Sequence, residues 1–190
     1  MEPDDFQLLD AWCGGDRLAG QRLLERHFDT LTRFFQSKCE AEADDLVQRT
    51  MLACVAARGT LRRESTFRTW LFTVARNELF QHLRAGRRGG ERVDLALSSI
   101  EELVTTPTTR LARVAEQRRV HEALRRLPVE QQTLMELHYW EGLEAPELAE
   151  VFDLEPGTVR VRLHRAREKL RELLELPAEA SEQAVRNAKV

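Results

Sequence analysis

Helical periodicity runs through almost the whole chain and limits what it can fold into. Apolar residues recur at spacings of three and four over residues 4–88 and again over 111–176, which places them on one face of an α-helix. Runs that alternate apolar and polar residues are scarce, and only nine glycines and six prolines occur in 190 residues. Because sheets need such runs and the turns between them, the sequence predicts an all-α fold.

The helical periodicity stops once, over residues 89–112. Gly, Ser, Thr and Pro gather in this part of the chain, and we expect only one short helical turn in it, around Ile100–Val104. We therefore predict two small helical domains joined by a flexible linker. The predicted segments are a first domain over residues 1–88, the linker over 89–112, a second domain over 113–176 and a frayed polar tail over 177–190.

The net charge of −3 hides a strong local asymmetry. Counting Asp and Glu against Lys and Arg gives −5 for residues 1–54, +6 for 55–92, −7 for 93–155 and +4 for 156–174. Local potential, more than whole-chain charge, decides where a polyanion binds. The two basic segments favour two contacts with one long polyanion. The acidic surplus at the start has two interpretations that stay open, simple solvation or a protein-binding surface.

The second domain contains the pattern of a helix-turn-helix. The helix RRVHEALRRLP ends at Pro128, and the next, VEQQTLMELHYWEG, has Gly142 at its C-terminal cap. The short helix LEAPELAEVF and the turn DLE follow, and Pro156 suits the first position of the last helix. Two helices joined by a three-residue turn, the second rich in arginine, indicate a four-helix domain with a helix-turn-helix.

The last helix separates an apolar face from a cationic face. At 100° per residue, its apolar residues form one stripe that faces the core: Val159, Leu163, Ala166 and Leu170. The first three turns carry arginines with no acidic partner before Glu168, whereas a merely solvated helix interleaves both signs at i, i+4. Cations near a helix N-terminus also oppose the macrodipole. A bound polyanion would offset that cost, so the pattern favours nucleic-acid binding.

The sequence resembles a known family at these residues. ALRRLPVEQQTLMELHYWEGLEAPELAEVFDLEPGTVRVRLHRAREKL resembles region 4 of bacterial RNA polymerase sigma factors of the sigma-70 family, extracytoplasmic-function (ECF) type. DDLVQRTMLACVAARGTLRRESTFRTWLFTVARNELFQHLRAGRR resembles region 2 of the same family through its D-x-x-Q, F-x-T-W-L and A-R-N runs. The two resemblances stand in the order that the family has and cover nearly the whole chain.

The resemblance implies three binding surfaces. The last helix would read the minus-thirty-five promoter element through Thr158, Arg160, Val161, Arg162, His164, Arg165 and Arg167. The Phe67–Arg84 helix and its flanking segments would bind the minus-ten element through Leu61, Arg62, Arg63, Thr69, Arg76, Asn77, Arg84, Arg87 and Arg88. The D-x-x-Q helix would dock on core RNA polymerase through Asp45, Gln48 and Arg49.

Some residues depart from the family's pattern. Asp153 replaces the usual turn glycine, and aspartate tolerates the left-handed conformation that such a turn needs. Glu155 replaces a serine-like N-cap and is a poorer cap. Arg63 stands where glycine is common and Leu61 where phenylalanine is common, and Arg49 takes the place of an acidic residue. The base preference at the minus-ten element and the role of Arg49 are therefore left open.

The Phe67–Arg84 helix supports the resemblance from its own pattern. Drawn as a helical wheel, this helix has two apolar stripes. Between them lies a mixed, mostly polar stripe: Thr69, Thr73, Arg76, Asn77, Phe80 and Arg84. A mixture of arginines, an amide, hydroxyls and an aromatic ring suits single-stranded DNA, because bases stack on rings and phosphates pair with arginine. By itself Asn77 would be an ordinary surface amide. The resemblance implies that it reads an extruded base, whose extrusion costs a few kcal/mol.

Other classes of protein fit the sequence less well. The five histidines and the three cysteines, Cys13, Cys39 and Cys54, share no metal-site or triad spacing, and no phosphate-binding glycine loop occurs. We therefore expect no enzyme, no cofactor and no small-molecule substrate. No apolar run reaches the length of a membrane span, and the N-terminal segment is acidic. We expect no membrane insertion and a reducing, cytoplasmic location.

These observations predict a sigma factor that binds core RNA polymerase, recognises promoter DNA and starts transcription of a dedicated gene set. An anti-sigma protein is an expected further partner. One alternative is a helix-turn-helix regulator, which would need a dimer interface or a ligand pocket. The other is a sigma-mimicking decoy that binds an anti-sigma protein, but a decoy would lose the arginines at positions 160, 162 and 165.

Overall fold

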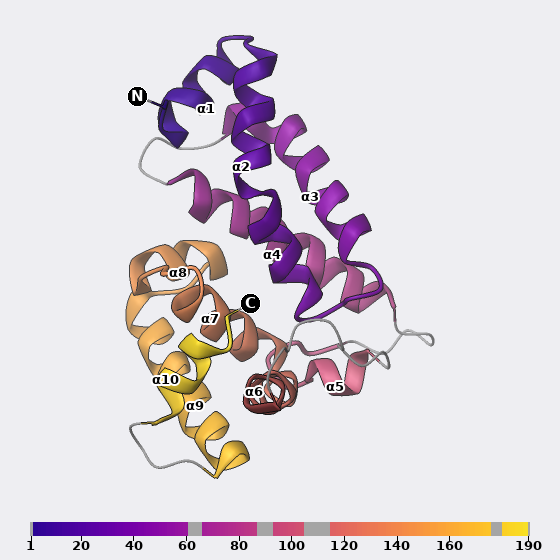
Figure 1. The fold of residues 1–190 in the computed structure, drawn as a ribbon, viewed down its shortest axis with the longest axis vertical. Coiled ribbons are helices and arrows are strands. Elements are labelled where there is room, and N and C mark those ends of the chain that lie inside the picture. Colours follow the sequence, from indigo (N-terminus) through magenta and orange to yellow (C-terminus); the bar gives the residue numbers. More distant parts are fainter. Residues whose placement is uncertain (1, 61–65, 87–92, 105–114, 176–179, 190) are drawn as a thin grey trace.

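The computed structural model describes residues 2–60, 66–86, 93–104, 115–175 and 180–189. These residues form ten α-helices and one 3-10 helix, and the described part of the chain contains no strand (Figure 1). The all-α class is confirmed. The helices gather into two lobes, α1–α4 at the top of Figure 1 and α6–α10 at the bottom, with α5 beside α6.

The first lobe, called the N-lobe below, contains α1 (Asp5–Cys13), α2 (Arg17–Gln36), α3 (Ala43–Ala57), the 3-10 helix η1 (Arg58–Thr60) and α4 (Phe67–Ala85). Short polar residues start three of its helices, since side chains of Asp4, Asp16 and Thr66 accept hydrogen bonds from first-turn backbone N–H groups. Fully buried apolar side chains from α2, α3 and α4 form its core: Leu23, Leu31, Phe35, Leu46, Phe72 and Leu79. The helices predicted for the first half of the chain therefore pack together as a bundle.

Helices α1 and α2 approach closely at Gly20. A Cβ atom added at this glycine would lie 2.4 Å from the indole of Trp12, which packs from α1. We expect Gly20→Ala to lower the free energy of unfolding by about 1–3 kcal/mol, because overpacking a tight contact forces the helices apart. Gly157→Ala is the matched control, since an added Cβ there meets nothing within 4 Å. The measurement is thermal unfolding followed by circular dichroism. Equal unfolding temperatures for the two variants would contradict the prediction.

The second lobe, called the C-lobe below, contains α6 (Ala115–Arg125), α7 (Val129–Tyr139), α8 (Ala145–Phe152), α9 (Pro156–Leu174) and α10 (Ala180–Asn187). The predicted helix-turn-helix is present as α8, a three-residue turn and α9. Asp153 in this turn adopts the expected left-handed conformation, with φ of 54°. Glu155 makes no side-chain capping bond at the start of α9, as expected of a poor cap.

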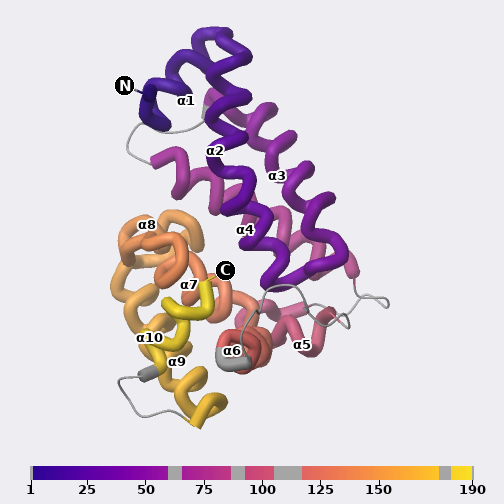
Figure 2. Tube along the Cα trace, viewed as in Figure 1, coloured from indigo at the N-terminus to yellow at the C-terminus, as the bar shows by residue number. Residues whose placement is uncertain are grey.

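The C-terminal segment corrects the expectation of a frayed polar tail. Residues 180–187 form α10, which packs on α6, α7 and α9 (Figure 2). Val185 and Ala188 are fully buried, and the Trp140 indole N–H donates to the carbonyl oxygen of Val185 at 2.7 Å. Few apolar residues sit in this segment, but Val185 and Ala188 face the C-lobe. Residues 180–189 are therefore part of the fold.

The described residues of the predicted linker are also structured. Residues 93–104 include α5 (Ile100–Leu103), where the sequence predicted one helical turn. Leu95 and Ile100 are buried. The backbone N–H of Val129 donates to the carbonyl oxygen of Ser98 at 2.9 Å, which ties this segment to the start of α7. This segment is therefore anchored to the C-lobe.

Candidate nucleic-acid interface

The outward face of α9 is cationic and open to solvent. Its apolar stripe is buried against the rest of the C-lobe, as the wheel predicted. Five of the predicted minus-thirty-five residues are exposed on the opposite face: Thr158, Arg160, Val161, His164 and Arg165. No carboxylate of the described chain forms an ion pair with Arg160 or Arg165. The helix therefore offers two unpaired guanidinium groups, one of them within a turn and a half of its N-terminus.

Two other arginines of α9 are paired within the C-lobe. Arg162 Nη1 lies 2.5 Å from Glu130 Oε2 on α7, and Arg167 pairs with Glu182 on α10. The hydrogen bond from Arg167 lowers the pKa of the Glu182 carboxyl below its usual value. The sequence predicted that both arginines contact DNA. The structure places each on the shoulder of the helix, where a carboxylate from a neighbouring helix already holds it.

A groove follows the second half of α4, where the minus-ten residues were predicted. Its walls are Arg76, Asn77, Phe80, Gln81, Arg84 and Ala85. Asn77 and Arg84 are exposed. The guanidinium groups of Arg76 and Arg84 lie over the Phe80 ring, 4.7 and 5.9 Å from its centroid. The Phe80 ring is only 3% exposed and supports the two guanidinium groups from below. The groove therefore offers guanidinium groups for phosphates and an exposed amide for base edges.

Arg76 is the most constrained side chain of this groove. Its Nη1 donates to the carbonyl oxygen of Val151 on α8 at 3.2 Å, and its guanidinium lies 5.1 Å from the centroid of the Phe152 ring. Burial lowers the pKa of the Arg76 guanidinium, and the positive charges of Arg84 and Arg162 act in the same direction. Arg76 thus joins the groove to the C-lobe.

Other minus-ten residues lie elsewhere than the sequence implied. Thr69 belongs to the polar stripe of the wheel, yet it is only 1% exposed. Its hydroxyl lies 2.8 Å from that of Thr66 and 3.4 Å from Glu147 Oε1 on α8. Packing between the lobes therefore covers it. Five further predicted residues lie outside the described part of the chain: Leu61, Arg62, Arg63, Arg87 and Arg88.

The third predicted surface lies on α3. Asp45 and Gln48 are exposed. Arg49 differs, because its Nη2 lies 2.7 Å from Glu78 Oε2 and so ties α3 to α4. The departure from the family pattern at this position thus has a structural role.

An apolar patch surrounds Gln48, and sequence reasoning missed it. Phe28 from α2 with Leu52 and Val55 from α3 are 47%, 61% and 40% exposed. A shallow hollow between α2 and α3 contains these three residues together with Asp44, Val47, Gln48 and Met51. We call this hollow the α2–α3 patch. In the sequence, the signal was apolar side chains at i, i+3 and i+4 that lie outside the buried stripe of α3. An exposed apolar patch of this kind marks a protein-binding surface.

No group of three or more His, Cys, Asp or Glu side chains in the described segments could hold a metal ion. Among the described helices, none has the length and apolarity needed to cross a membrane.

Comparisons with known proteins match both halves of the chain. The family model described as Sigma-70 region 2 matches residues 22–89, and that described as Sigma-70, region 4 matches residues 117–170. RNA polymerase sigma-H factor of Pseudomonas aeruginosa is 30% identical, over 92% of this chain and 95% of that protein. ECF RNA polymerase sigma factor SigM of Mycobacterium tuberculosis is 31% identical, over 91% of this chain and 86% of that protein.

Two solved structures share the fold. One is CnrH in complex with the cytosolic domain of CnrY, with a TM-score of 0.64 and 27% identity over 88% of this chain and 95% of CnrH. The other is the sigma factor RpoE in complex with the anti-sigma factor NepR from Bartonella quintana, with a TM-score of 0.65 and 25% identity. That match covers 82% of this chain and 96% of RpoE.

Proposed function

We propose that this chain, which belongs to the sigma-70 family of RNA polymerase sigma factors and to its ECF type, directs core RNA polymerase to the promoters of a dedicated gene set. Residues 1–88 would dock on polymerase and open the minus-ten region, and residues 113–176 would read the minus-thirty-five element. The observation that carries the proposal is the cationic outer face of α9, where Arg160 and Arg165 are exposed and unpaired among the described residues.

The geometry of α9 supports reading of the major groove. A recognition helix contacts base edges through residues near its N-terminus, and Thr158, Arg160 and Val161 occupy that part of α9. Arginine donates two hydrogen bonds to the O6 and N7 atoms of guanine. Arg165, about one and a half turns further on, would contact the phosphates that flank the groove. A sigma-mimicking decoy would have no use for these exposed cations.

The groove along α4 supports binding of the opened minus-ten strand. It combines two guanidinium groups, which lie over the buried Phe80 ring, with the exposed amide of Asn77. Unpaired bases offer ring faces and hydrogen-bonding edges that duplex DNA hides. The two promoter surfaces therefore differ in kind, one suited to duplex DNA and one to single strands.

The α2–α3 patch supports docking on core polymerase. We expect Leu52→Ala to weaken the binding of core polymerase about fivefold or more, since truncating an anchor at the centre of an interface costs at least about 1 kcal/mol. Leu97→Ala is the matched control, because Leu97 is 76% exposed and lies outside the patch. Fluorescence anisotropy of labelled protein titrated with core polymerase measures both. Equal affinities for the two variants would remove the patch from the docking surface.

An anti-sigma protein is a further proposed partner. The proposal is supported by the two solved structures of similar fold, which are complexes of CnrH with CnrY and of RpoE with the anti-sigma factor NepR. Pull-down from cells that express the tagged chain would identify such a partner.

Reconstitution tests the proposed function as a whole. Core polymerase with and without this protein is incubated with fragmented genomic DNA of the source cell, and bound fragments and transcript starts are mapped. We expect starts that depend on the protein and share paired minus-ten and minus-thirty-five motifs. Anti-sigma binding without any such start would identify a decoy instead. DNA binding by the protein without polymerase, as a dimer, would identify a conventional regulator.

A further inference from the structure

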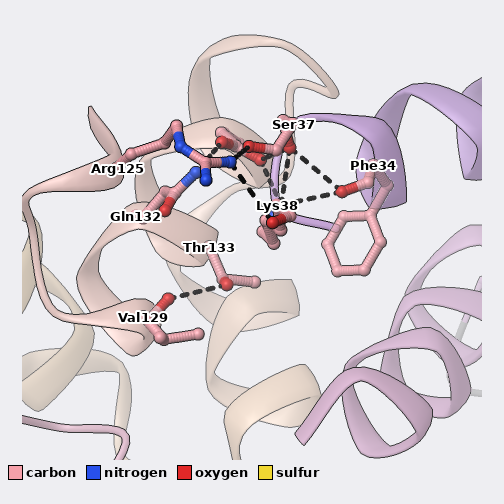
Figure 3. A network of polar contacts seen from close by, with 8 residues as sticks. Phe34, Ser37, Lys38, Arg125, Val129, Gln132 and Thr133 are labelled. Atoms are coloured by element: carbon pink, nitrogen blue, oxygen red, sulfur yellow. Dashed lines mark hydrogen bonds and ion pairs between the residues drawn. The ribbon is translucent and has the colours of Figure 1, made fainter. Parts of the chain in front are cut away.

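A buried ion pair joins the two lobes. Lys38, just after α2, pairs with Glu136 of α7, and their side chains are 0% and 2% exposed. Figure 3 shows Lys38 beside Ser37 and Phe34. The Lys38 ammonium also donates to the carbonyl oxygen of Phe34 at 2.9 Å and to the hydroxyl of Ser37 at 3.1 Å. The Ser37 hydroxyl donates in turn to Glu136 Oε2 at 2.9 Å. The end of α2 is therefore bonded to the centre of α7.

Two other C-lobe side chains complete this network. Arg125 of α6 donates to the carbonyl oxygens of Ser37 and Lys38 at 3.4 and 3.3 Å. Gln132 of α7 donates to the second carboxylate oxygen of Glu136 at 2.8 Å. A cation at the C-terminal end of a helix interacts favourably with the macrodipole. The C-lobe thus supplies both the counter-charge and a cap for α2.

Burial makes this ion pair sensitive to the loss of either partner. Desolvation lowers the pKa of Lys38, and the Glu136 carboxylate opposes that shift. A buried pair adds little net stability, but removal of one partner leaves an uncompensated charge inside the protein. If the lobes separate, both side chains reach water and the penalty is relieved. Loss of one charge therefore favours separation of the lobes.

A second contact covers the minus-ten surface. Helix α8 packs against α4. It accepts the hydrogen bond from Arg76 at the Val151 carbonyl oxygen and covers Thr69. At the same junction Arg68 Nη2 lies 3.7 Å from Glu141 Oε2, beyond the end of α7. Two of the described residues assigned to the opened promoter strand are thus occupied by the C-lobe.

We propose that the Lys38–Glu136 pair is a latch that closes the lobes on each other, and that the closed form withholds two minus-ten residues of α4, Thr69 and Arg76, from nucleic acid. The masking part of this proposal rests on the proposed function, whereas the latch itself does not. Separation of the lobes would free Thr69 and Arg76 together. Partners that bind the open lobes would therefore act against the latch.

The chain contains its own reporter of lobe separation. Cys39 follows Lys38 and is fully buried, and burial, with the charge of Glu42, raises its pKa to about 12. Arg125 of the C-lobe is near enough to oppose that shift. Cys54 is equally buried in α3, within the N-lobe, and burial raises its pKa to about 12 as well. Cys13 is exposed and is removed in the test protein by Cys13→Ser.

The test compares the full-length Cys13→Ser protein with and without Lys38→Met. We expect Ellman's reagent to modify neither remaining thiol quickly in the first protein, since buried thiols with raised pKa react slowly. With Lys38→Met we expect Cys39 to react about 100-fold faster or more while Cys54 stays protected, because an unpaired buried charge shifts the closed-to-open equilibrium by about that factor. Peptide mapping by mass spectrometry identifies the modified cysteine.

A second variant separates a latch from simple damage to the fold. Lys38→Met with Glu136→Met replaces the ion pair by two apolar side chains, and such replacements of buried pairs are often neutral or stabilising. We expect Cys39 to be protected again in this double variant. Continued protection of Cys39 in Lys38→Met alone would overturn the latch. Equal exposure of Cys54 would also overturn the latch, because it would show that the N-lobe itself unfolds. A double variant as reactive as the single one would overturn it too, because the unpaired charge would then not be the cause of the exposure.

The masking is tested with a labelled pool of single-stranded DNA of random sequence. We expect the free Lys38→Met variant to bind it about tenfold or more tightly than the unaltered protein. Unchanged affinity despite exposed Cys39 would overturn the masking. Transcription with core polymerase reports separately on the proposed function. If Cys39 becomes reactive in Lys38→Met but neither this variant nor the unaltered protein supports transcription from a promoter, the latch is supported and the proposed function is contradicted.

Discussion

The Arg160→Ala variant is expected to lose most of its preference for the minus-thirty-five sequence while binding core polymerase as well as the unaltered protein does. Arg160 is exposed near the start of α9, and its guanidinium has no ion-pair partner in the described structure. A bidentate contact between arginine and guanine is worth about 1–3 kcal/mol of discrimination, which corresponds to about 5- to 150-fold in affinity. Competition between preferred and scrambled promoter fragments for the holoenzyme measures this ratio.

Lys169→Ala is the control for Arg160→Ala on the same helix. The Lys169 ammonium lies 3.3 Å from the Glu172 carboxylate near the far end of α9. Its removal therefore takes away one cation that does not contact base edges in the DNA major groove. We expect a small and uniform loss that shrinks as salt is raised, because only counterion release is affected. If Arg160→Ala weakened binding to preferred and scrambled fragments equally, Arg160 would be a phosphate contact and the base reader would have to be sought elsewhere on α9.

The local parts of the fold could be predicted because local sequence determines them. The apolar stripe of α9 and the three-residue turn before it depend on residues only a few positions apart. Asp153 could be assigned a left-handed conformation because it stands where the resemblance implies a turn glycine, and aspartate tolerates that conformation. The exposed residues of α9 followed from the same wheel. Prediction succeeded where helical geometry alone decides which way a side chain points.

Helix α10 could not be predicted from its own residues. It has eight residues, and so short a helix is marginal in water by itself. Its stability comes from the burial of Val185 and Ala188 against the C-lobe and from the Trp140 indole bond to Val185. Each of these contacts joins residues that are far apart in the sequence, and no periodicity records them. The same holds for the pairing of Arg162 with Glu130, which removed one arginine from the open face of α9.

The contact between the lobes is the largest feature that sequence reasoning missed. Lys38 and Glu136 are separated by 98 positions, and neither stands out in its own segment of the sequence. The sequence treated the two halves as independent, so it assigned Thr69 to an open face that α8 covers. Burial of a charged residue depends on which surfaces meet, and only the tertiary structure supplies that. The α2–α3 patch was missed for the opposite reason, since apolar residues were assigned to the core by default.

Asn77→Ala is expected to impair opening of duplex promoters while leaving the fold and polymerase binding near normal. Asn77 is exposed in the α4 groove, and the only side-chain contact it makes among the described residues is a weak hydrogen bond from Arg76 at 3.3 Å. Its truncation should change the free energy of unfolding by no more than about 0.5 kcal/mol. Hydrogen bonds to an extruded base exist only after opening, and losing one or two of them costs about 1–3 kcal/mol. The open complex should therefore form roughly tenfold less readily.

Permanganate footprinting of unpaired thymines on duplex and pre-melted templates measures the Asn77→Ala effect. A pre-melted bubble relieves only the opening part of the defect, because the contact with the unpaired base is still missing. Gln21→Ala is the control, since Gln21 is an exposed amide on α2, away from the groove, and it should open duplex DNA normally. Normal opening of duplex DNA by Asn77→Ala would make Asn77 an ordinary surface amide and leave Arg76 and Arg84 as the nucleic-acid contacts of the groove.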